Sequence, residues 1–320
     1  MEKTEKKKED VSKAPEKIGQ GFTASVYSPA LVCKDWSDSE NDKKKFTHIT
    51  KLSASMTSLT YTIHVALQMR KAWAMHKLYW QQHSSHSIFK SLQNTPMKKL
   101  VIDAIVQREP DDFYNLPDSK LCTSCVLASP SESSLPLLGM YLPKLAHGWK
   151  EEFTTKRTAF SNILTFKDVR SIHHLIRGVL IAHFLGFTHN DLHRDNLMFH
   201  SDGLPRIIDW EHAILFLQHS SERKHERMTD QMPDDWHQYM AFWKGGKLWN
   251  TPKQQIAGDW AWVHVLINET FPPEKLQTPS HRDIVSNLQE WLKRGTDGGM
   301  RTAALELEKY FLPPPPAQKK

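Results

Sequence analysis

The stretch of sequence that most constrains the fold runs from His189 to Asn196 and is followed further along by Asp209. Two short apolar runs and one polar turn lie between these residues: Leu197–Phe199, Arg206–Ile208 and Ser201–Gly203. Apolar runs joined by a turn that contains glycine predict a strand–turn–strand hairpin. Such a hairpin would bring the polar residues at its two ends close together.

Three side chains at the ends of this hairpin have the chemistry of a metal and acid–base site. Asp191 lies on the loop before the first strand, Asn196 comes at the start of that strand, and Asp209 follows the second. Transfer of a phosphoryl group needs an aspartate that accepts or orients the proton of the attacking hydroxyl, and oxygen ligands for Mg²⁺. The spacing therefore predicts a phosphoryl-transfer site, with a pair of surface aspartate turns as the alternative.

The pattern His189-x-Asp191-x-x-x-x-Asn196, with Asp209 after it, resembles the catalytic loop and the metal-binding aspartate of the protein-kinase-like superfamily. The resemblance implies an α+β, bilobal protein-kinase-like fold with a small β-rich N-lobe and a mostly helical C-lobe. It also implies ATP and Mg²⁺ as cofactors. Asp191 would be the catalytic base, and Asn196 and Asp209 would be the metal ligands. His193 stands where Ser/Thr kinases have a lysine, and it completes the set of expected catalytic residues.

The N-terminal part of the resemblance is a nucleotide-binding region. Residues 17–27 predict a strand, a glycine-rich turn and a second strand, and Ala30–Lys34 predicts a short third strand that carries a lysine. Glycines allow backbone amides to approach phosphates, and a strand-borne lysine can bind phosphate oxygens. An ordinary edge-strand lysine is the alternative for Lys34. The residues expected to bind the nucleotide are Gly19, Gly21, Val26, Lys34, Met140 and Leu142.

Residues 60–83 show helical periodicity, and the expected buried side contains Ile63, Leu67, Ala74, Met75 and Leu78. In the superfamily a glutamate on this helix pairs with the strand lysine, but the segment 43–108 contains no glutamate. The polar segment from Trp36 to Lys51 is expected to be a loop, and acids within it are candidate partners of Lys34.

Further strands are expected at Leu100–Val106 and Leu137–Leu142, with a loop rich in Asp, Pro and Ser between them. The second of these strands would end at the interlobe hinge. A helix is expected at 166–187, because an apolar stripe there ends at Gly186, a residue that suits a helix C-terminus. Its histidines, His173, His174 and His183, are expected to be surface or semi-buried residues.

Beyond Glu211, the stretch to about Asn250 occupies the place of the kinase activation segment, and Thr251-Pro252-Lys253 stands where the family has A-P-E. Asp259 opens an apolar stretch that resembles a buried kinase helix, so it would hydrogen-bond to the catalytic-loop backbone, a role compatible with that of a helix cap. Residues 288–311 resemble the terminal helix pair of protein kinases, in which Arg301 would lack its usual glutamate partner.

Four segments follow from these patterns: a disordered charged tail (1–16), the N-lobe (17–142), the C-lobe (143–312) and a Pro-rich tail (313–320). The 320 residues are 39% hydrophobic, which is enough for two packed lobes. A formal net charge of +6 permits weak attraction to nucleic acid without predicting it.

The three cysteines, Cys33, Cys122 and Cys125, indicate an intracellular chain rather than a disulfide framework. A metal or redox role for Cys122-x-x-Cys125 is the alternative to plain loop cysteines. No apolar run is long enough to cross a membrane, and the first residues lack the apolar core of a signal peptide. We expect a cytoplasmic or nuclear protein.

The departures from the superfamily pattern limit which regulation and which substrates we expect. Asn190 replaces the arginine through which activation-loop phosphorylation orders the site, so control of that kind is not expected. His193 and the Asp209-Trp210-Glu211 sequence are similar to aminoglycoside and choline kinases, which phosphorylate small hydroxyl compounds. The expected function is a divergent Ser/Thr-type protein kinase. The alternatives are a small-molecule hydroxyl kinase and a pseudokinase that serves as a binding module.

Overall fold

The computed structural model describes residues 14–20, 24–53, 55–83, 98–126, 137–155, 163–215 and 252–311. The protein is an α+β structure, and its contacts divide the chain into two compact units. Unit 1 comprises Met1–His64 and Leu116–Lys144, and unit 2 comprises Val65–Asn115 and Leu145–Lys320. The second unit thus includes a stretch, Val65–Asn115, that lies within the N-lobe boundaries expected from the sequence.

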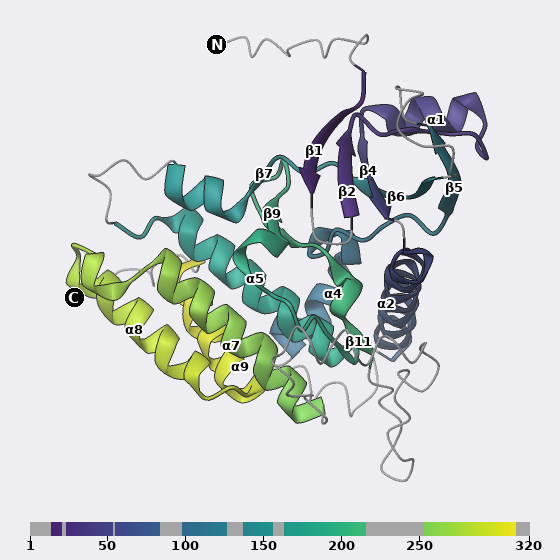
Figure 1. Cartoon of the computed structure of the whole chain (residues 1–320). Helices are drawn as coiled ribbons and strands as arrows, with labels where there is room; N and C mark the ends of the chain where they lie inside the picture. The colour runs from purple at the N-terminus through teal and green to yellow at the C-terminus, as the bar shows by residue number, and fades with distance from the viewer. Residues whose placement is uncertain are drawn as a thin grey trace, which may run out of the picture. The chain divides into compact units, whose positions relative to one another are not determined.

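Unit 1 is built on a six-stranded antiparallel sheet (Figure 1). In spatial order its strands are β1 (Glu16–Gln20), β2 (Ala24–Ser28), β4 (His48–Ser53), β6 (Leu137–Pro143), β5 (Leu121–Val126) and β3 (Val32–Cys33). One face of the sheet packs around Leu52 and Tyr141, and the other packs Met140 and Leu142 against Leu59 of the following helix. Both faces are therefore covered by apolar contacts.

The predicted hairpin at the start of the sheet is confirmed, because β1 pairs antiparallel with β2. Strand β1 begins at Glu16, a residue that the sequence assigned to the tail. Gly21 and most of the tail, residues 1–13, lie outside the described residues. The predicted third strand is only two residues long, and it lies at the edge of the sheet with Lys34 just past its end.

The expectation of a loop from Trp36 to Lys51 is wrong. Helix α1 (Asp38–Lys45) begins after Ser37, whose side chain accepts a hydrogen bond from the Glu40 backbone N–H. None of its residues is buried, so the helix has no apolar stripe that the sequence could reveal. Strand β4 follows, and it lies in the middle of the sheet between β2 and β6.

The segment predicted as a strand at 100–106 is helical. A π-helical turn, η1 (Lys98–Ile102), leads into α4 (Asp103–Gln107). Leu100, Val101 and Ile105 are almost fully buried there. A short apolar run of this kind fits a buried helix as well as a strand, because burial on all sides removes the periodicity that separates them.

Helix α2 (Met56–Gln82) confirms the prediction at 60–83, but most of its expected buried residues are exposed. Leu67, Met75 and Leu78 are at least 42% exposed. Ile63 is buried as expected, and the other residues of the buried side are Leu59, Ala66, Met69 and Trp73, which recur at helical spacing. Because both sides of the helix carry apolar residues, periodicity alone did not distinguish them.

The helices of unit 2 include α5 (Phe166–Phe184), α7 (Pro252–Thr270), α8 (Pro279–Lys293) and α9 (Asp297–Glu308). Helix α5 contacts both α7 and α9, and α8 contacts α7 and α9 (Figure 1). A reciprocal capping box between Thr165 and Asp168 opens α5, and Gly186, at φ 91°, follows its C-cap. The predicted helix at 166–187 and the terminal helix pair are thus confirmed.

The hairpin predicted between Asn196 and Asp209 is also present in unit 2. Strands β9 (Leu197–Phe199) and β10 (Pro205–Ile207) pair antiparallel, and β7 (His147–Gly148) joins the other edge of β9. Strand β8 (Phe187–Thr188) pairs with β11 (Ile214–Leu215), so the chain before the loop and the chain after Asp209 lie side by side.

The three cysteines lie in strands or at their ends, not in loops. Cys33 of β3 is joined by a disulfide bond to Cys122 of β5, which corrects the expectation that the chain would contain no disulfide. Cys125, in the same strand, is a buried free thiol. Among the described residues, none of the helices is both long enough and apolar enough to cross a membrane.

Gly139 of β6 gives a test of packing in the sheet. A Cβ atom added there would overlap the sulfur of Cys125 and press on the Thr50 methyl group. We expect Gly139→Ala to lower the free energy of unfolding by about 1–3 kcal/mol, measured by urea denaturation. Gly148→Ala is the matched control, because a Cβ at Gly148 would meet no atom within 4 Å. Equal effects of the two substitutions would contradict the close packing at Gly139.

Candidate active site

A single buried carboxylate in α7 holds the loop that carries the candidate catalytic residues. Asp259 accepts one hydrogen bond from the backbone N–H of His189 (2.9 Å) and another from that of Asn190 (2.7 Å). This confirms the supporting role expected for Asp259. Its position differs from the expectation, because Asp259 lies in the interior of α7 rather than at a helix start.

The charge of Asp259 is balanced by His183 at the end of α5. The two imidazole nitrogens of His183 lie 2.9 Å from Asp259 Oδ2 and 3.0 Å from Asp297 Oδ1, and the His183 side chain is fully buried. Only a doubly protonated imidazole can donate to both carboxylates. Burial alone would lower the pKa of His183, but the hydrogen bonds to Asp259 and Asp297 raise it to about 9.

Asp297, which begins α9, completes this group. Its Oδ1 atom also accepts a hydrogen bond from Trp260 Nε1 (2.9 Å). Burial alone would raise the pKa of Asp297, but the hydrogen bond and the charge of His183 lower it. Two carboxylates and one imidazolium thus tie α5, α7 and α9 to the loop that begins at His189.

His183, expected to be a surface or semi-buried residue, is therefore a buried charged group. His173 and His174 are buried as well. His174 stacks on Phe113 and lies within hydrogen-bond distance of the Asp112 carbonyl, and burial lowers its pKa to about 3. His174 is consequently neutral at pH 7, whereas His183 is charged.

Asn190 adopts a left-handed backbone conformation, with φ 65°. Its side-chain amide donates hydrogen bonds to Thr188 Oγ1 (3.0 Å) and to the His212 carbonyl (3.2 Å). Asparagine is one of the few non-glycine residues that tolerate this conformation. Asn190 therefore turns the chain and fastens it to the segment after Asp209.

His189 joins the loop to the end of the hairpin. Its Nε2 atom lies 2.8 Å from the Ile208 carbonyl, and its Nδ1 atom accepts a hydrogen bond from the Asp191 backbone N–H (3.3 Å). These partners assign the proton to Nε2. The His189 imidazole thereby links Ile208, which precedes Asp209, to Asp191, the candidate base.

Asp191, Asn196 and His193 form one contact group. The Asn196 amide nitrogen donates to the Asp191 carbonyl (2.7 Å) and to its carboxylate (3.1 Å). His193 Nε2 lies 3.5 Å from the same carboxylate oxygen. Because the Asn196 nitrogen faces Asp191, its amide oxygen points the other way and can serve as a metal ligand.

The charges in this group reinforce one another. Burial alone would raise the pKa of Asp191, but the hydrogen bond from His193 and the charges of nearby histidines lower it. The pKa of His193 is raised, first by its hydrogen bond to Asp191 and further by the charges of Asp195 and Asp209. At neutral pH, Asp191 is therefore an ionised carboxylate that can accept a proton.

Asp209 is placed beside this group by the hairpin. The backbone N–H of the preceding residue, Ile208, donates to the Asn196 carbonyl (3.0 Å). Asp209 has φ 61°, the left-handed conformation that Asn190 also adopts and that aspartate tolerates better than most residues. The next residue, Trp210, is buried against His189 and Tyr114, with ring centroids 4.8 Å and 5.1 Å away.

In unit 1, four of the residues expected to bind a nucleotide lie in strands: Gly19 in β1, Val26 in β2, and Met140 and Leu142 in β6. Gly19 lies at a register shift in β1 opposite Val26, and Met140 and Leu142 are buried in β6. Lys34 lies beyond the edge strand and is exposed. It is therefore separated from β2 by the rest of the sheet.

A different lysine lies among these residues. Lys51 of β4 is the register partner of Val26 on one side and of Met140 on the other. Directly paired residues in a sheet project from the same face, so Lys51 shares a face with both of them. Helix α2, which packs its Leu59 and Ile63 on that face, contains no acidic residue.

Three features were not predicted from the sequence: the position of Lys51, the contacts of Asp297 and the burial of His183. A signal for Lys51 did exist, because the β-branched pair Ile49 and Thr50 precedes it. The charged residues around them made the whole segment resemble a loop. Nothing local indicates Asp297, since its contacts lie far away in sequence.

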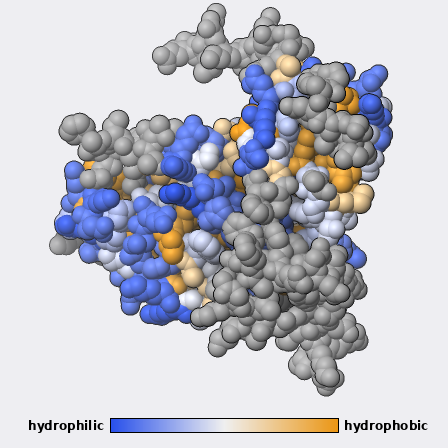
Figure 2. Space-filling view, in the orientation of Figure 1, coloured by the Kyte–Doolittle hydropathy of each residue, from blue (hydrophilic) through white to orange (hydrophobic). Residues whose placement is uncertain are grey.

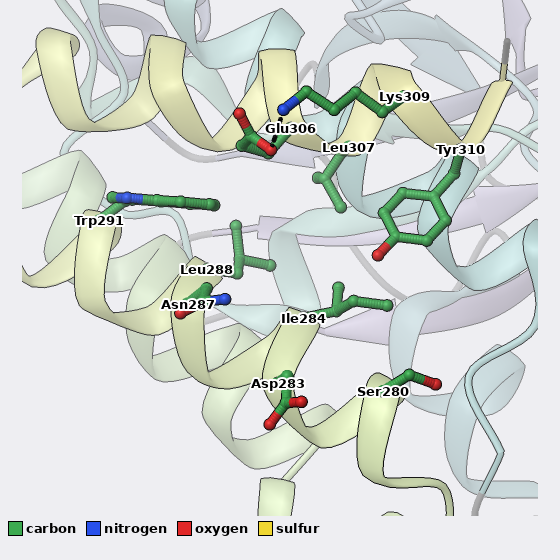
Figure 3. Close-up of a pocket in the computed structure, with 10 residues that line it drawn as sticks. All are labelled: Ser280, Asp283, Ile284, Asn287, Leu288, Trp291, Glu306, Leu307, Lys309 and Tyr310. Carbon is green, nitrogen blue, oxygen red and sulfur yellow. Dashed lines mark hydrogen bonds and ion pairs between the residues drawn. The ribbon is translucent and has the colours of Figure 1, made fainter.

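The cavity shown in Figure 3 lies elsewhere, between α8 and α9, and contains none of the predicted site residues. Its volume is about 340 Å³, and its walls include Trp291, Leu288 and Tyr310. Glu306 and Lys309 form an ion pair at its edge (Figure 3). On the face drawn in Figure 2, the helical part is mostly hydrophilic, with hydrophobic residues in small groups.

No protein-family model matches the sequence, and no curated protein matches it.

His183 provides a prediction about pH. Its pKa is raised from 6.5 to about 9 in the folded protein, so its stabilising effect is complete below about pH 6.5 and is lost as the pH rises through 9. The shift corresponds to about 3 kcal/mol of unfolding free energy. We expect urea denaturation between pH 6 and 9.5 to show this loss in the wild type, and His183→Gln to be less stable with a flatter profile.

His200→Gln is the matched control, because His200 is a partly exposed histidine on the β9–β10 turn. That variant should keep the wild-type slope. A His183→Gln variant that kept the slope as well would show that His183 is not the group that titrates.

Proposed function

We propose that this protein is an ATP- and Mg²⁺-dependent phosphotransferase with a protein-kinase-like bilobal fold, and that it is a divergent Ser/Thr-type protein kinase. The observation that carries the proposal is the contact of the Asn196 amide with the Asp191 carboxylate, on a hairpin that also delivers Asp209. An acid–base carboxylate and two oxygen donors on one short element form the minimal apparatus for phosphoryl transfer.

Asp191, Asn196 and Asp209 each have a distinct proposed role. Asp191 orients the attacking hydroxyl and takes its proton, since its lowered pKa keeps it ionised at neutral pH. Asn196 is held in place by Asp191 and offers its amide oxygen to a metal ion. Asp209 offers its carboxylate as a second ligand for a metal ion.

The donor set fits Mg²⁺. The amide oxygen of Asn196 and the carboxylate of Asp209 are hard oxygen ligands, which this ion prefers. When bound, Mg²⁺ would neutralise charge on the nucleotide phosphates. The protein's own part is to hold these ligands in position. The Asn196 amide donates to the Asp191 carbonyl, and the Ile208 N–H donates to the Asn196 carbonyl.

We propose Lys51, in place of Lys34, as the lysine that binds nucleotide phosphates. The argument rests on its register with Val26 and Met140, two residues expected at the nucleotide. Because helix α2 contains no acidic residue, an acidic partner for Lys51 would have to come from another element. This departure sets the protein apart from ordinary protein kinases, in which a helix glutamate fills that role.

A small-molecule hydroxyl kinase is the second candidate, favoured by the contact of His193 with Asp191 and by the buried Trp210-Glu211 pair. The third, a pseudokinase that binds partners, is favoured by the absence of an acid in α2. If the protein is an enzyme, its partner would be a protein substrate or a small hydroxyl compound. We also propose an intracellular location and no role in nucleic-acid binding.

Substitutions in the hairpin test the proposed roles. We expect Mg²⁺-ATP to raise the melting temperature of the wild type and of Asp191→Asn, but not of Asp209→Asn. Asp191→Asn should lower kcat by about 10²–10⁴-fold, because it removes the acid–base group. Turnover is measured by transfer of labelled phosphate to a generic protein, to choline and to an aminoglycoside.

Asp283→Asn is the control for both measurements, since Asp283 is an exposed aspartate of α8 and is not part of the hairpin group. The proposal would be refuted by an Asp191→Asn enzyme with wild-type turnover. Transfer only to choline or the aminoglycoside would favour the second candidate, and no melting shift at millimolar Mg²⁺-ATP would favour the third.

The two lysines form a matched pair for a second test. Lys51→Met should lower kcat/KM for ATP by about 100-fold, the usual loss when one stabilising donor to a transition state is removed. Lys34→Met should change kcat/KM by less than about twofold, because Lys34 lies beyond the edge strand. The reverse order would restore Lys34 as the phosphate-binding lysine.

A further inference from the structure

The Cys122-x-x-Cys125 sequence lies in an irregular part of the unit 1 sheet. The pairing of β5 with β6 shifts register between Cys122 and Cys125. In a regular strand, residues three positions apart point to opposite faces. The shift instead allows both cysteines to be buried in one apolar cluster, and the residues between them, Thr123 and Ser124, are more exposed.

Cys33 lies next to both cysteines of this sequence. It is the register partner of Cys125 in the β3–β5 pair, and its Cα atom is 5.9 Å from that of Cys122, to which it is disulfide-bonded. All three cysteines belong to the same buried cluster. Edge strand β3 and its neighbour β5 thus bring three sulfur atoms together, although Cys33 and Cys122 are 89 residues apart in sequence.

A carboxylate lies at the rim of this cluster. One oxygen of Asp35 is 3.7 Å from the Cys33 sulfur, and the Asp35, Cys33 and Cys122 ligand atoms lie within 4.8 Å of one another. The residues of the register shift hold this carboxylate, because it accepts hydrogen bonds from Thr123 N, Thr123 Oγ1 and Ser124 Oγ (2.9, 2.8 and 2.5 Å).

We propose that Cys33, Cys122 and Asp35 form a Zn²⁺ site when the disulfide is reduced. Two thiolates and one carboxylate, with a water molecule as the fourth ligand, are a donor set that zinc accepts in tetrahedral geometry. The hydrogen bonds from Thr123 and Ser124 are the outer contacts that orient a ligating carboxylate. The proposal is independent of the function proposed for the protein.

The chemistry that opens the site is a thiol–disulfide exchange. A dithiol reductant supplies two electrons and two protons to the Cys33–Cys122 bond and is itself oxidised to a disulfide. Binding of Zn²⁺ then releases the two thiol protons as the sulfurs become thiolates. In an intracellular compartment, where thiols are kept reduced, the metal would replace the covalent link between β3 and β5.

The test uses the full chain, reduced under anaerobic conditions with a phosphine and transferred to metal-free buffer. Co²⁺, a spectroscopic substitute for Zn²⁺, should produce thiolate-to-metal charge-transfer absorption and the visible bands of a tetrahedral ion. One equivalent of Zn²⁺ should abolish both signals. The untreated disulfide form should give neither, since its sulfurs are already bonded to each other.

Asp35→Asn keeps both thiols and should weaken Co²⁺ binding by about 10–100-fold, as the loss of a carboxylate around a metal typically does. Asp42→Asn is its control, because Asp42 is an exposed acid of α1. Cys33→Ser should abolish the charge-transfer band, and circular dichroism shows whether that variant is folded.

Cys125→Ser is the matched control for the thiols, because Cys125 is buried in the same cluster but lies outside the ligand group among the described residues. It should retain the charge-transfer band at full intensity. The proposal is overturned if the reduced wild type binds no Co²⁺, if Asp35→Asn binds as tightly as the wild type, or if Cys125→Ser loses the band.

Discussion

The candidate active site depends on one buried carboxylate. Asp259 accepts two backbone hydrogen bonds from consecutive residues, His189 and Asn190, and so fixes the direction in which the chain leaves β8. A buried charge of this kind is stable only when it is paired, and His183 supplies the pairing. His183 is in turn held by Asp297, so the loop is fastened by three helices that are distant in sequence.

The local parts of this arrangement were accessible from the sequence. Residues 189–196 and Asp209 occur at a fixed spacing, and the turn at Ser201–Gly203 predicted the hairpin that the structure contains. Helix α5 was equally clear, because its apolar stripe ends at a glycine with positive φ. In both cases, the information is contained in neighbouring residues.

The parts that sequence analysis missed are set by partners far along the chain. Strand β4 is polar in composition and becomes a central strand only because β2 and β6 flank it. The segment 98–107 is buried on several sides, so it carries no period that could distinguish a helix from a strand. The pairing of Cys33 with Cys122 likewise requires the register of β3 on β5, which no spacing of cysteines reveals.

The side chain that follows Asp209 is costly to displace. Trp210 is only 1% exposed and is enclosed by the rings of Tyr114 and His189, and its indole N–H donates to the Ile207 carbonyl. A compound that acted by expelling this side chain would have to offset the loss of its packing, about 3–5 kcal/mol when a buried tryptophan is removed altogether. The backbone on the C-terminal side of Asp209 is therefore held in place by a buried ring.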